Sequence, residues 1–599
     1  MGRGRSVVGV VGLGSVGEPL LAMVRAAGHH AVGVDTGLDV LARVDRRLKA
    51  AEAADGATGT YTLTNEIAAL GYADLVVEAV PEVLAVKSAV LRGLDSVCWD
   101  RTVLVTTTAR LPLTRLAIAS GRSAATLGLR LLRPPAPGRG VEPVRTAMSA
   151  DDAVAALDTL VARLGLVPVT IGGRPAAEAA ALLHAFLNRA VTLAEEPHAS
   201  QEDIDTAMRI GCGLPTGPLR LADELGLDTV HTALTRLFAE TGDRRFRPAS
   251  LLSSLVDAGL LGRKSGQGLY TYDDLGRPCP PSAAAPVVTA PSGTGRGPAA
   301  GVVRRVGIVG SGTGARTIAD AVVAAGLTAV VAHGRERGAG ARRARATGAY
   351  RPLADCDVVI EALAEPALTS DVSDVFATLG VVCRPGALLA TASPDVSVAA
   401  CARASGRPGD VLGLRFPGPV RAAPLVELVR TRTTGARAVR TARAFCDLIG
   451  RTAITSWDRP RTLVHRLLFP YLAHAVELLD HPDADARSTD AAVESGFGHR
   501  MGPYTMLDTI GLDASLAALR RLHEAYPETD GPPPRLLEQL VARGALGRTS
   551  DHGFRRTPAG GGPRLPAIGA GADAGTGADG EGDTDGDGGG QVAEGDGAG

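Results

Sequence analysis

The sequence predicts an α/β domain with a mainly parallel sheet followed by an all-α helical domain, and it predicts that this pair occurs twice in one chain. In the first part of each copy, apolar runs such as VVGVVG, AVGVD, DLVVEAV and VLVTT alternate with helical stretches. This alternation is typical of βαβ units and a parallel sheet. The second part contains runs such as AALLHAFLNRAVTLAEE, with apolar residues at three- and four-residue spacing. That spacing predicts amphipathic helices.

The duplication is visible in repeated short motifs. Gly211 and Gly217 recur as Gly496 and Gly502, and Asp223 recurs as Asp508, each time 285 residues later. The glycine turn after the first strand recurs with an offset of 298. We therefore expect α/β domains at 1–173 and 304–456, helical domains at 174–276 and 457–557, a Pro/Ala/Gly linker at 277–303 and a disordered Gly/Asp-rich tail at 558–599. Residues 1–276 are called copy 1 below, and residues 304–557 are called copy 2.

Composition excludes several kinds of partner. The net charge is −1, and the tail alone carries eight acids and one arginine, which leaves +6 on the rest without a long basic run. Nucleic acid is therefore not an expected partner. No apolar run reaches the roughly 18 residues that a membrane span needs, and the apolar N-terminus predicts a buried first strand. The seven cysteines are scattered without CxxC spacing, which favours reduced thiols in a cytoplasmic protein.

We expect no metal site. Residues 583–594, DTDGDGGGQVAE, satisfy the spacing of a calcium-binding loop. An EF-hand also needs a helix on each side of that loop, and glycines flank it here. The pattern is therefore assigned to the disordered tail.

A dinucleotide site is predicted in copy 1. Gly12, Gly14 and Gly17 follow the first strand directly, which permits a tight turn and close approach of a pyrophosphate to a helix N-terminus. Asp35 ends the next strand, where an acid can bind both ribose hydroxyls of NAD and repel a 2′-phosphate. In copy 2 the third glycine is Ala315 and the acid is His333, which leaves two alternatives, preference for NADP or an empty site, of which we favour the empty site.

Longer motifs resemble one family, the 3-hydroxyacyl-CoA dehydrogenases, including bacterial 3-hydroxybutyryl-CoA dehydrogenases. The resemblance is carried by DLVVEAVPEVLAVK, ASQEDIDTAMRIGCGLPTGPLRLADELGLDT and LGRKSGQGLYTY in copy 1, and by DVVIEALAE and GFGHRMGPYTMLDTIGLD in copy 2. It implies a Rossmann domain followed by a dimerising helical domain. It also implies oxidation of an (S)-3-hydroxyacyl-CoA, with NAD as the hydride acceptor.

The resemblance also assigns catalytic positions. The family's general-base histidine falls on Arg130 and Arg415, and the glutamate that orients it falls on Glu142 and Glu427. Other polar positions of the family's site are also replaced. They fall on Ala109, Arg133 and Ala180 in copy 1, and on Pro394, Gly418 and His465 in copy 2.

The family's further cofactor contacts fall on Glu82, Lys87 and Lys264. Two of the three lysines in the chain therefore lie at cofactor-contact positions. The corresponding positions of copy 2 are Glu365, Ser370 and Thr549, which again favours a nucleotide site in copy 1 alone.

Two functional hypotheses remain at this point. Arginine stays protonated at any working pH and cannot accept the hydroxyl proton of an alcohol, so we expect an ion pair between Arg130 and Glu142. One hypothesis is a working dehydrogenase in which His184 or His465 replaces the missing base. The other is a non-catalytic NAD-binding or structural relative. Under both hypotheses we expect helical regions 175–275 and 460–555 to pack together as a pseudo-dimer within the chain, because their apolar faces would otherwise be exposed.

Overall fold

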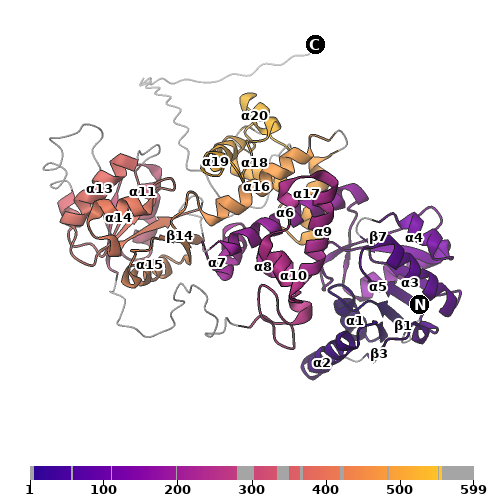
Figure 1. Cartoon of the computed structure of the whole chain (residues 1–599). Helices are drawn as coiled ribbons and strands as arrows, with labels where there is room; N and C mark the ends of the chain where they lie inside the picture. Colours follow the sequence, from indigo (N-terminus) through magenta and orange to yellow (C-terminus); the bar gives the residue numbers. More distant parts are fainter. Residues whose placement is uncertain are drawn as a thin grey trace, which may run out of the picture.

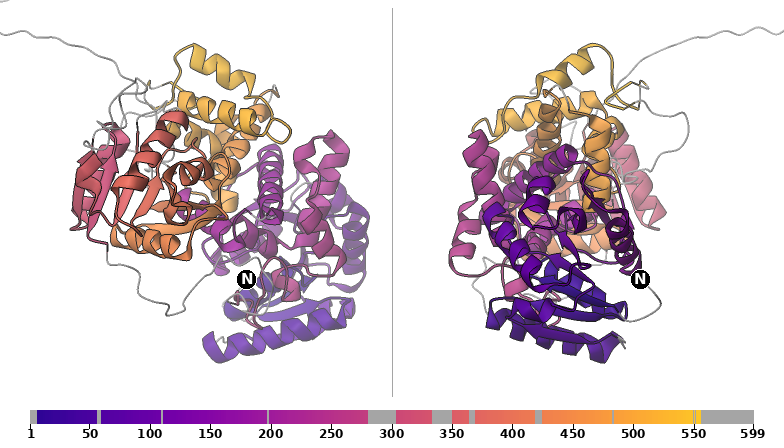
Figure 2. Two further views of the ribbon diagram at one scale, coloured as in Figure 1. Left: turned by 60° about the vertical axis from the view of Figure 1, so that its left-hand side comes forward. Right: turned by 90° about the vertical axis from the view of Figure 1, so that its right-hand side faces the viewer.

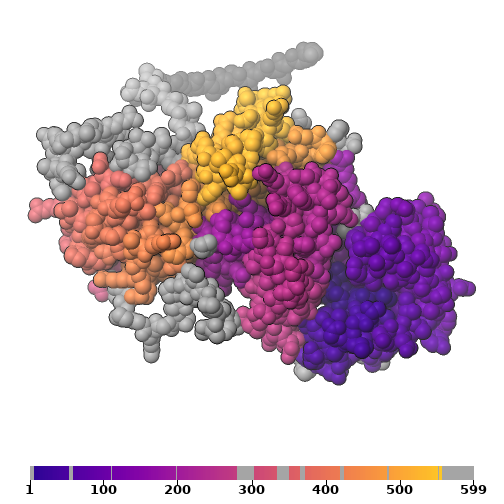
Figure 3. Space-filling model, viewed as in Figure 1, coloured from indigo at the N-terminus to yellow at the C-terminus, as the bar shows by residue number. Residues whose placement is uncertain are grey.

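The computed structural model confirms the predicted fold class. It describes residues 6–55, 59–108, 111–196, 198–279, 303–332, 350–363, 369–417, 424–481, 484–548, 550 and 552–555. The two α/β regions lie at opposite ends of the molecule, with the helical regions between them (Figures 1 and 3). The left-hand view of Figure 2 shows the same order from another direction. The linker beyond residue 279 and the calcium-like pattern of the tail lie outside the described residues.

The first sheet has the strand order β3-β2-β1-β4-β5-β6-β7-β8 and is parallel except for the β6–β7 pair. Its central strands are buried on both faces, which explains their continuous apolar sequence. The strands are β1 (Val7–Val11), β2 (His30–Val34), β3 (Tyr61–Thr64), β4 (Leu75–Glu78), β5 (Val103–Thr106), β6 (Thr126–Arg130), β7 (Gly140–Val144) and β8 (Val167–Pro168). The helices are α1 (Gly17–Ala26), α2 (Leu38–Asp55), α3 (Leu84–Val97), α4 (Leu113–Ala119) and α5 (Asp151–Arg163), with short 3₁₀ turns η1 (Ile67–Leu70) and η2 (Ser123–Ala125).

The second sheet repeats this plan with the order β10-β9-β11-β12-β13-β14-β15, and only β13–β14 is antiparallel. The strands are β9 (Arg305–Val309), β10 (Thr328–Ala332), β11 (Val358–Glu361), β12 (Leu388–Thr391), β13 (Val411–Arg415), β14 (Leu425–Arg430) and β15 (Thr452–Trp457). The helices are α11 (Thr313–Ala324), α13 (Thr369–Val382), α14 (Val398–Ser405) and α15 (Ala436–Leu448), with 3₁₀ turns η6 (Arg351–Leu353) and η7 (Pro408–Asp410).

The two helical regions share one hydrophobic core. Helix α6 packs against both α16 and α17 of the other copy, and the ring centroids of Phe186 and Tyr471 are 5.5 Å apart. Copy 1 contributes α6 (Gly173–Glu195), α7 (Gln201–Thr206), the π-helical turn η3 (Ala207–Gly211), α8 (Pro218–Leu225), α9 (Leu227–Thr241), η4 (Arg244–Phe246), α10 (Ser250–Asp257) and η5 (Arg263–Ser265). Copy 2 contributes α16 (Leu463–Leu478), α17 (Ala486–Phe497), α18 (Pro503–Ile510), α19 (Leu512–Ala525) and α20 (Arg535–Ala542).

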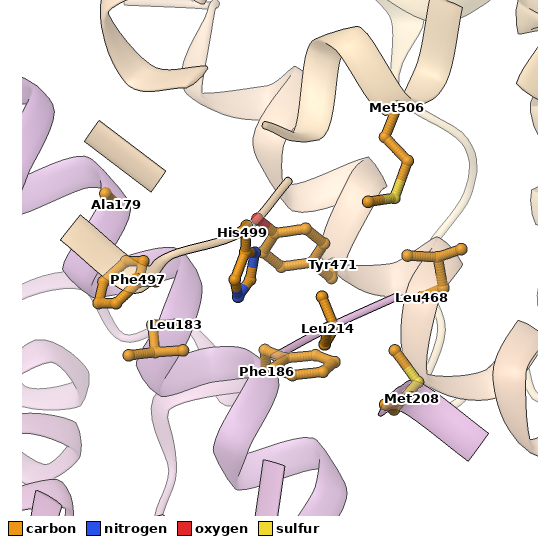
Figure 4. A pocket seen from close by; sticks show the side chains of 10 residues that line it. All are labelled: Ala179, Leu183, Phe186, Met208, Leu214, Leu468, Tyr471, Phe497, His499 and Met506. Atoms are coloured by element: carbon orange, nitrogen blue, oxygen red, sulfur yellow. The ribbon is translucent and has the colours of Figure 1, made fainter. Parts of the chain in front are cut away.

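A small apolar cavity of about 10 Å³ lies where these helices meet. Figure 4 shows side chains of both copies around it. Leu183 and Phe186 face it from copy 1, and Leu468 and Tyr471 stand 285 residues later in copy 2. Its volume holds at most about one water molecule, so the helical regions are closely packed at this junction.

Each helical region also contacts the sheet of the other copy. The carbonyl of His198 accepts a hydrogen bond of 2.9 Å from the Trp457 amide, which places the connection between α6 and α7 beside β15. In the other direction, a Cβ atom on Gly496 would lie only 2.3 Å from Leu132 Cδ1. The two copies are therefore joined in two ways. Their helical regions pack together, and each helical region also contacts the α/β domain of the other copy.

The repeated aspartates anchor the end of each helical region. Asp223 accepts hydrogen bonds from the amides of Leu269 (3.0 Å) and Tyr270 (2.8 Å). Asp508 accepts bonds from the amides of Phe554 (2.9 Å) and Arg555 (2.8 Å). The motif that reveals the duplication is thus a structural one, because the same carboxylate fixes the terminal hairpin of each copy.

Within the described part of the chain, no helix combines the length and the apolar character needed to cross a membrane. The same residues contain no cluster of His, Cys, Asp and Glu side chains that could bind a metal ion.

Candidate functional site

The glycine turn after β1 leaves space for a ligand beside the start of α1. Gly12 has φ +88°, and a Cβ atom there would lie 2.9 Å from the backbone of Ala79. A Cβ on Gly17 would lie 1.8 Å from the carbonyl oxygen of Gly12. These two positions therefore require glycine for the turn itself. Gly14 differs, because no atom lies within 4 Å of the place where its Cβ would be.

Asp35 is fixed beside this turn. Its Oδ2 accepts a hydrogen bond of 2.8 Å from the Leu13 amide, and its Oδ1 accepts one of 2.9 Å from Gly37. The carboxylate at the end of β2 is half-buried and held next to the open face of Gly14. An open glycine face, a helix N-terminus and a ribose-binding acid are the features that NAD requires, so these four predicted residues fit the cofactor.

Lys87 and Glu82 lie at the start of α3, at the same edge of the sheet. Lys87 is fully buried, and its ammonium donates to Glu78 Oε1 at 2.9 Å and to the carbonyl of Thr107 at 2.7 Å. Glu82 is half-buried and accepts a bond of 2.6 Å from the Thr108 hydroxyl. The motif DLVVE contains Glu78, but its role as the partner of Lys87 was not predicted from the sequence.

Lys264 belongs to the helical region and not to the sheet. Its Nζ donates to Asp228 Oδ2 at 2.6 Å. The turn that carries it contacts the first domain through Arg47, which donates to the carbonyl of Arg263 at 2.7 Å. The structure therefore brings this turn against α2 and does not bring Lys264 into the hydrogen-bond network of Lys87.

The predicted ion pair in copy 1 is confirmed. Arg130 on β6 lies directly opposite Glu142 on β7, and its guanidinium donates to Glu142 Oε2. The other carboxylate oxygen accepts a bond of 3.0 Å from the amide of Gly172, at the start of α6. Both side chains are largely buried, with exposed fractions of 13% and 11%. Glu142 thus holds two strands and a helix start together.

This arrangement does not provide a general base. The guanidinium remains protonated, and both oxygens of Glu142 already accept hydrogen bonds. Ala180, which stands on α6 at another polar position of the resemblance, has no side-chain polar group. Ala109, at a third such position, lies outside the described residues.

Arg133 links three parts of the molecule. It is buried, and its Nη1 donates to the carbonyl of Phe497 in copy 2 at 2.8 Å. Its Nη2 donates to the Thr216 hydroxyl at 3.0 Å and to Glu224 Oε2 at 3.2 Å. The contact with Phe497 could not be predicted from sequence spacing, because the two residues are 364 positions apart.

The corresponding pair in copy 2 is arranged differently. Arg415 again lies opposite Glu427, but it donates to the carbonyls of Arg459 (2.9 Å) and Val396 (3.2 Å). Glu427 is fully buried and accepts bonds from the Ser456 hydroxyl (2.5 Å) and the Leu463 amide (2.9 Å). Burial raises the pKa of Glu427. Arg415 and Glu427 thus lie opposite each other on adjacent strands, as Arg130 and Glu142 do. Their hydrogen bonds, however, go to separate partners.

Arginines also link the second sheet to its helical region. Asp395 follows β12 and pairs with Arg461 at 2.9 Å and with Arg521 at 2.7 Å. Arg461 has φ +64°, an uncommon conformation for a residue other than glycine. Together with the bonds of Arg415 to Val396 and Arg459, these contacts link the second sheet to the segment before α16 and to α19.

The two histidines considered as substitute bases have different surroundings. His465 is buried against Phe469, and its Nδ1 is 2.5 Å from the Thr462 hydroxyl. Burial and the charges of nearby arginines lower its pKa to about 3. His184 is half-buried, and its Nδ1 is 2.5 Å from the carbonyl of Ala180 one turn earlier on α6. His465 is thus a packed residue, whereas His184 shares a helix face with Ala180.

The glycine turn of copy 2 is only partly preserved. Ala315 replaces the third glycine and is buried. Glu361, which matches Glu78, bonds to the hydroxyls of Thr391 (2.7 Å) and Ser393 (3.0 Å). Burial raises the pKa of this glutamate. The remaining predicted positions of copy 2, namely His333, Glu365, Gly418, Thr549 and the side chain of Ser370, lie outside the described residues.

Comparison with known proteins identifies both kinds of domain. The NAD-binding domain of 3-hydroxyacyl-CoA dehydrogenase matches residues 7–174 and 331–459, and the C-terminal domain of the same family matches residues 179–272 and 463–557. The match in copy 2 begins after its glycine turn.

Individual relatives agree with this assignment. A 3-hydroxybutyryl-CoA dehydrogenase of Mycobacterium tuberculosis is 34% identical over 281 residues, which cover 42% of this chain and 98% of that protein. A probable 3-hydroxybutyryl-CoA dehydrogenase of Deinococcus radiodurans is 32% identical, covering 44% and 99%. The crystal structure of a 3-hydroxybutyryl-CoA dehydrogenase from Escherichia coli has a TM-score of 0.50 at 21% identity and covers 90% of this chain and 99% of that one, which extends the shared fold over both copies. The chain therefore belongs to the 3-hydroxyacyl-CoA dehydrogenase family and contains that family's NAD-binding and C-terminal domains twice.

Proposed function

We propose that this protein binds one NAD through copy 1 and has lost, wholly or almost wholly, the ability to oxidise 3-hydroxyacyl-CoA. The observation that carries the proposal is the ion pair between Arg130 and Glu142. The family's reaction needs a group at the position of Arg130 that exchanges a proton near neutral pH. A guanidinium paired with a carboxylate stays protonated and cannot act as that group. Loss of a general base alone typically lowers the rate by roughly 10²–10⁴.

The nucleotide site of copy 1 supports binding without chemistry. When bound, NAD would supply a hydride acceptor. Gly14 and the start of α1 would hold its pyrophosphate, and Asp35 would bind the ribose hydroxyls. Because that carboxylate repels a 2′-phosphate, we expect preference for NAD over NADP. Glu82, Lys87 and Lys264 are proposed as further groups around the cofactor.

Two residues support the proposal that copy 1 no longer positions an acyl-CoA for reaction. Arg133 is engaged with Phe497, Thr216 and Glu224, and Ala180 offers no polar side chain. Acyl-CoA is the substrate class named for the relatives. We propose that this chain either binds it without turnover or does not bind it.

Copy 2 is proposed to act as a built-in partner. Its helical region packs on that of copy 1 in one core, and we infer that the two regions form a pseudo-dimer within the chain. Arg415, Arg461 and Arg521 contact Val396 and Asp395, which follow β12 of its sheet. The proposed role of copy 2 is therefore to support copy 1 and not to bind nucleotide. We also propose a cytoplasmic location, because all seven cysteines are free thiols.

Two variants, one in each glycine turn, test the cofactor proposal in the full chain. Gly314 lies two residues after Gly312, which is the counterpart of Gly14 in copy 2. Gly14 and Gly314 both have open space where a Cβ would lie, so Gly14→Asp and Gly314→Asp should both fold normally. NADH titration followed by fluorescence should show one site per chain and tighter binding of NADH than of NADPH. Gly14→Asp should abolish this binding, because its carboxylate would face the pyrophosphate, and Gly314→Asp should leave it unchanged.

The opposite pattern would overturn the proposal. Two NADH sites per chain, or loss of binding in Gly314→Asp alone, would show that copy 2 holds the cofactor. A stronger affinity for NADPH in the unmodified chain would contradict the role of Asp35.

A working dehydrogenase is a second candidate, favoured by one observation. His184 lies one turn after Ala180 on the same half-buried face of α6. If it replaces the family's base, turnover should be lost in His184→Gln. His465→Gln should then have no such effect.

A further inference from the structure

A buried corner of copy 2 combines side chains from both copies. Strands β13, β14 and β15 lie side by side there and contribute Arg415, Glu427 and Ser456 in that order. Arg466 lies in the first turn of α16, and its Nη2 donates to the carboxylate of Glu196, whose carbonyl accepts the amide of His198 at 2.6 Å. His198 enters from copy 1, because its carbonyl accepts the amide of Trp457 next to Ser456.

Three of these side chains have polar atoms without partners among the described residues. Both ring nitrogens of His198 are unpartnered, although the residue is only 2% exposed. Arg466 is 3% exposed and leaves Nε and Nη1 unpartnered, and Arg415 is 2% exposed and leaves Nε unpartnered. Unpaired buried polar atoms are costly and uncommon in folded proteins, so a group of them in one corner needs an explanation.

The other guanidinium atoms of Arg415 and Arg466 make defined contacts. Arg466 Nη2 donates to Glu196 at 3.1 Å, and its guanidinium lies 4.7 Å from the ring centroid of Tyr526. Arg415 is held by its two carbonyl acceptors. Both side chains are therefore fixed, and the unpartnered atoms are not the ends of freely moving chains.

Neighbouring carboxylates do not accept hydrogen bonds from the unpartnered nitrogens of His198, Arg415 and Arg466. Both oxygens of Glu427 are engaged, by Ser456 and by the start of α16. Asp458 Oδ2 accepts bonds from Ser397 (3.0 Å) and Ala399 (2.9 Å), and its Oδ1 lies 3.8 Å from Arg415 Nη2. Glu196 is 42% exposed and lies at the rim.

The unpartnered atoms are mostly donors, and this decides the kind of ligand. The two arginines offer three donor nitrogens, namely Nε of each and Nη1 of Arg466, and a neutral imidazole adds one donor and one acceptor. A water molecule accepts about two hydrogen bonds, so it cannot satisfy four donors. A halide ion accepts from several donors at once and occupies little more space than water.

We propose that His198, Arg415 and Arg466 form a buried site for one chloride-sized anion at the junction of the two copies. The charges agree with this assignment, since burial and the positive charges of Arg466, Arg459 and Arg415 lower the pKa of His198 to about 3. The anion would accept hydrogen bonds from the unpartnered nitrogens and would thereby connect His198 of copy 1 to the two arginines of copy 2. The proposal is independent of whether copy 1 binds NAD.

Crystals of the full chain grown in sodium bromide test the site directly. Anomalous scattering should show one bromide between the ring of His198 and the guanidinium of Arg466. Density there without an anomalous signal would identify a water molecule and overturn the proposal, as would an empty corner.

Thermal unfolding provides a second test in solution. At equal ionic strength, the midpoint should be higher in sodium chloride than in sodium gluconate, whose anion is too large to enter. Arg466→Met and His198→Phe should each remove this difference. Arg440→Met, which removes an exposed arginine of the same copy, should retain it. An equal chloride effect in all four proteins would overturn the proposal, because the effect would then be general.

Discussion

At the residue scale, the proposed loss of activity rests on Arg130 and Glu142. Arg130 is a permanent cation, and Glu142 pairs with it and with the start of α6. Under the proposed function, this ion pair stands where the family has a proton acceptor. Arg133, three positions later, contacts the other copy. The contacts of Arg130, Arg133 and Glu142 thus hold parts of the protein together.

The first prediction concerns restoration of activity. Arg130→His alone should raise turnover of acetoacetyl-CoA only slightly, because Ala109, Arg133 and Ala180 still lack the family's polar groups. Adding Ala109→Ser, Arg133→Asn and Ala180→Asn should raise it by much more than the single changes combined, since catalytic groups that act together are strongly non-additive. Steady-state assays of the four single variants and the quadruple variant measure this. Additive effects, or full activity from Arg130→His alone, would contradict it.

At the scale of elements, the strand pattern was predicted well. The four apolar runs became β1, β2, β4 and β5, and their burial on both faces explains why they are recognisable. Strand β3, Tyr61–Thr64, was not predicted, because a short strand with little burial has no distinct apolar pattern. The ion pair of Arg130 was predictable because its partner lies on the adjacent strand.

The rest of the site depends on contacts that sequence spacing cannot show. The partner of Lys87 was missed because Glu78 looks like the last residue of an ordinary strand. The contact of Arg133 with Phe497 arises only when the two copies pack. The corner formed by His198 likewise joins residues of both copies.

The second prediction concerns the terminal hairpin of copy 1. In Asp223→Asn, one of the two amides of Leu269 and Tyr270 would face an NH₂ group in place of an oxygen. Leaving such a buried donor unsatisfied costs about 1–3 kcal/mol. Urea unfolding should show this loss, while Asp257→Asn, at an exposed helix end, should change stability by less than about 0.5 kcal/mol. Equal stability of the two variants would contradict the anchoring role of Asp223.

At the scale of the whole molecule, the two copies form one structure. The shared helical core and the contacts of each helical region with the opposite sheet mean that neither copy is independent. In the proposed pseudo-dimer, each helical region would cover the apolar face of the other within one chain.

The third prediction tests a contact between the copies. Arg133→Met removes the hydrogen bond to Phe497 and the buried pair with Glu224, and it should destabilise the chain by about 2–3 kcal/mol. The control is Arg236→Met, whose pair with Glu240 is largely exposed and should be worth less than about 0.5 kcal/mol. Chemical unfolding of both variants decides between a structural link and an incidental contact. A loss in Arg133→Met no larger than in the control would exclude the link.

The fourth prediction concerns acid. His474 packs against Phe246 of copy 1, and burial together with the charge of Arg245 lowers its pKa to about 3, although Asp243 opposes this shift. Below pH 6.5 the unfolded chain binds a proton at this residue and the folded chain does not, so His474 lowers the free energy of unfolding as pH falls from about 6.5 towards 4. The effect approaches about 1.4 kcal/mol per pH unit.

A variant isolates this effect from other buried groups. Asp205 and Asp223, whose pKa values burial raises to about 6, change stability in the opposite direction. His474→Phe should therefore be compared with the unmodified chain at pH 7.5 and pH 5, and it should lose less stability on acidification. Identical losses in the two proteins would show that His474 is not held neutral.

The most direct test of the central claim is turnover of acetoacetyl-CoA by the unmodified full chain, followed by NADH oxidation at high protein concentration. An active member of the family serves as the positive control, and Gly14→Asp gives the background. We predict NADH binding with turnover at or near that background. A kcat in the usual enzyme range of about 1–10³ s⁻¹ that disappears in Arg130→Ala would contradict the account, because arginine would then be a working catalytic residue.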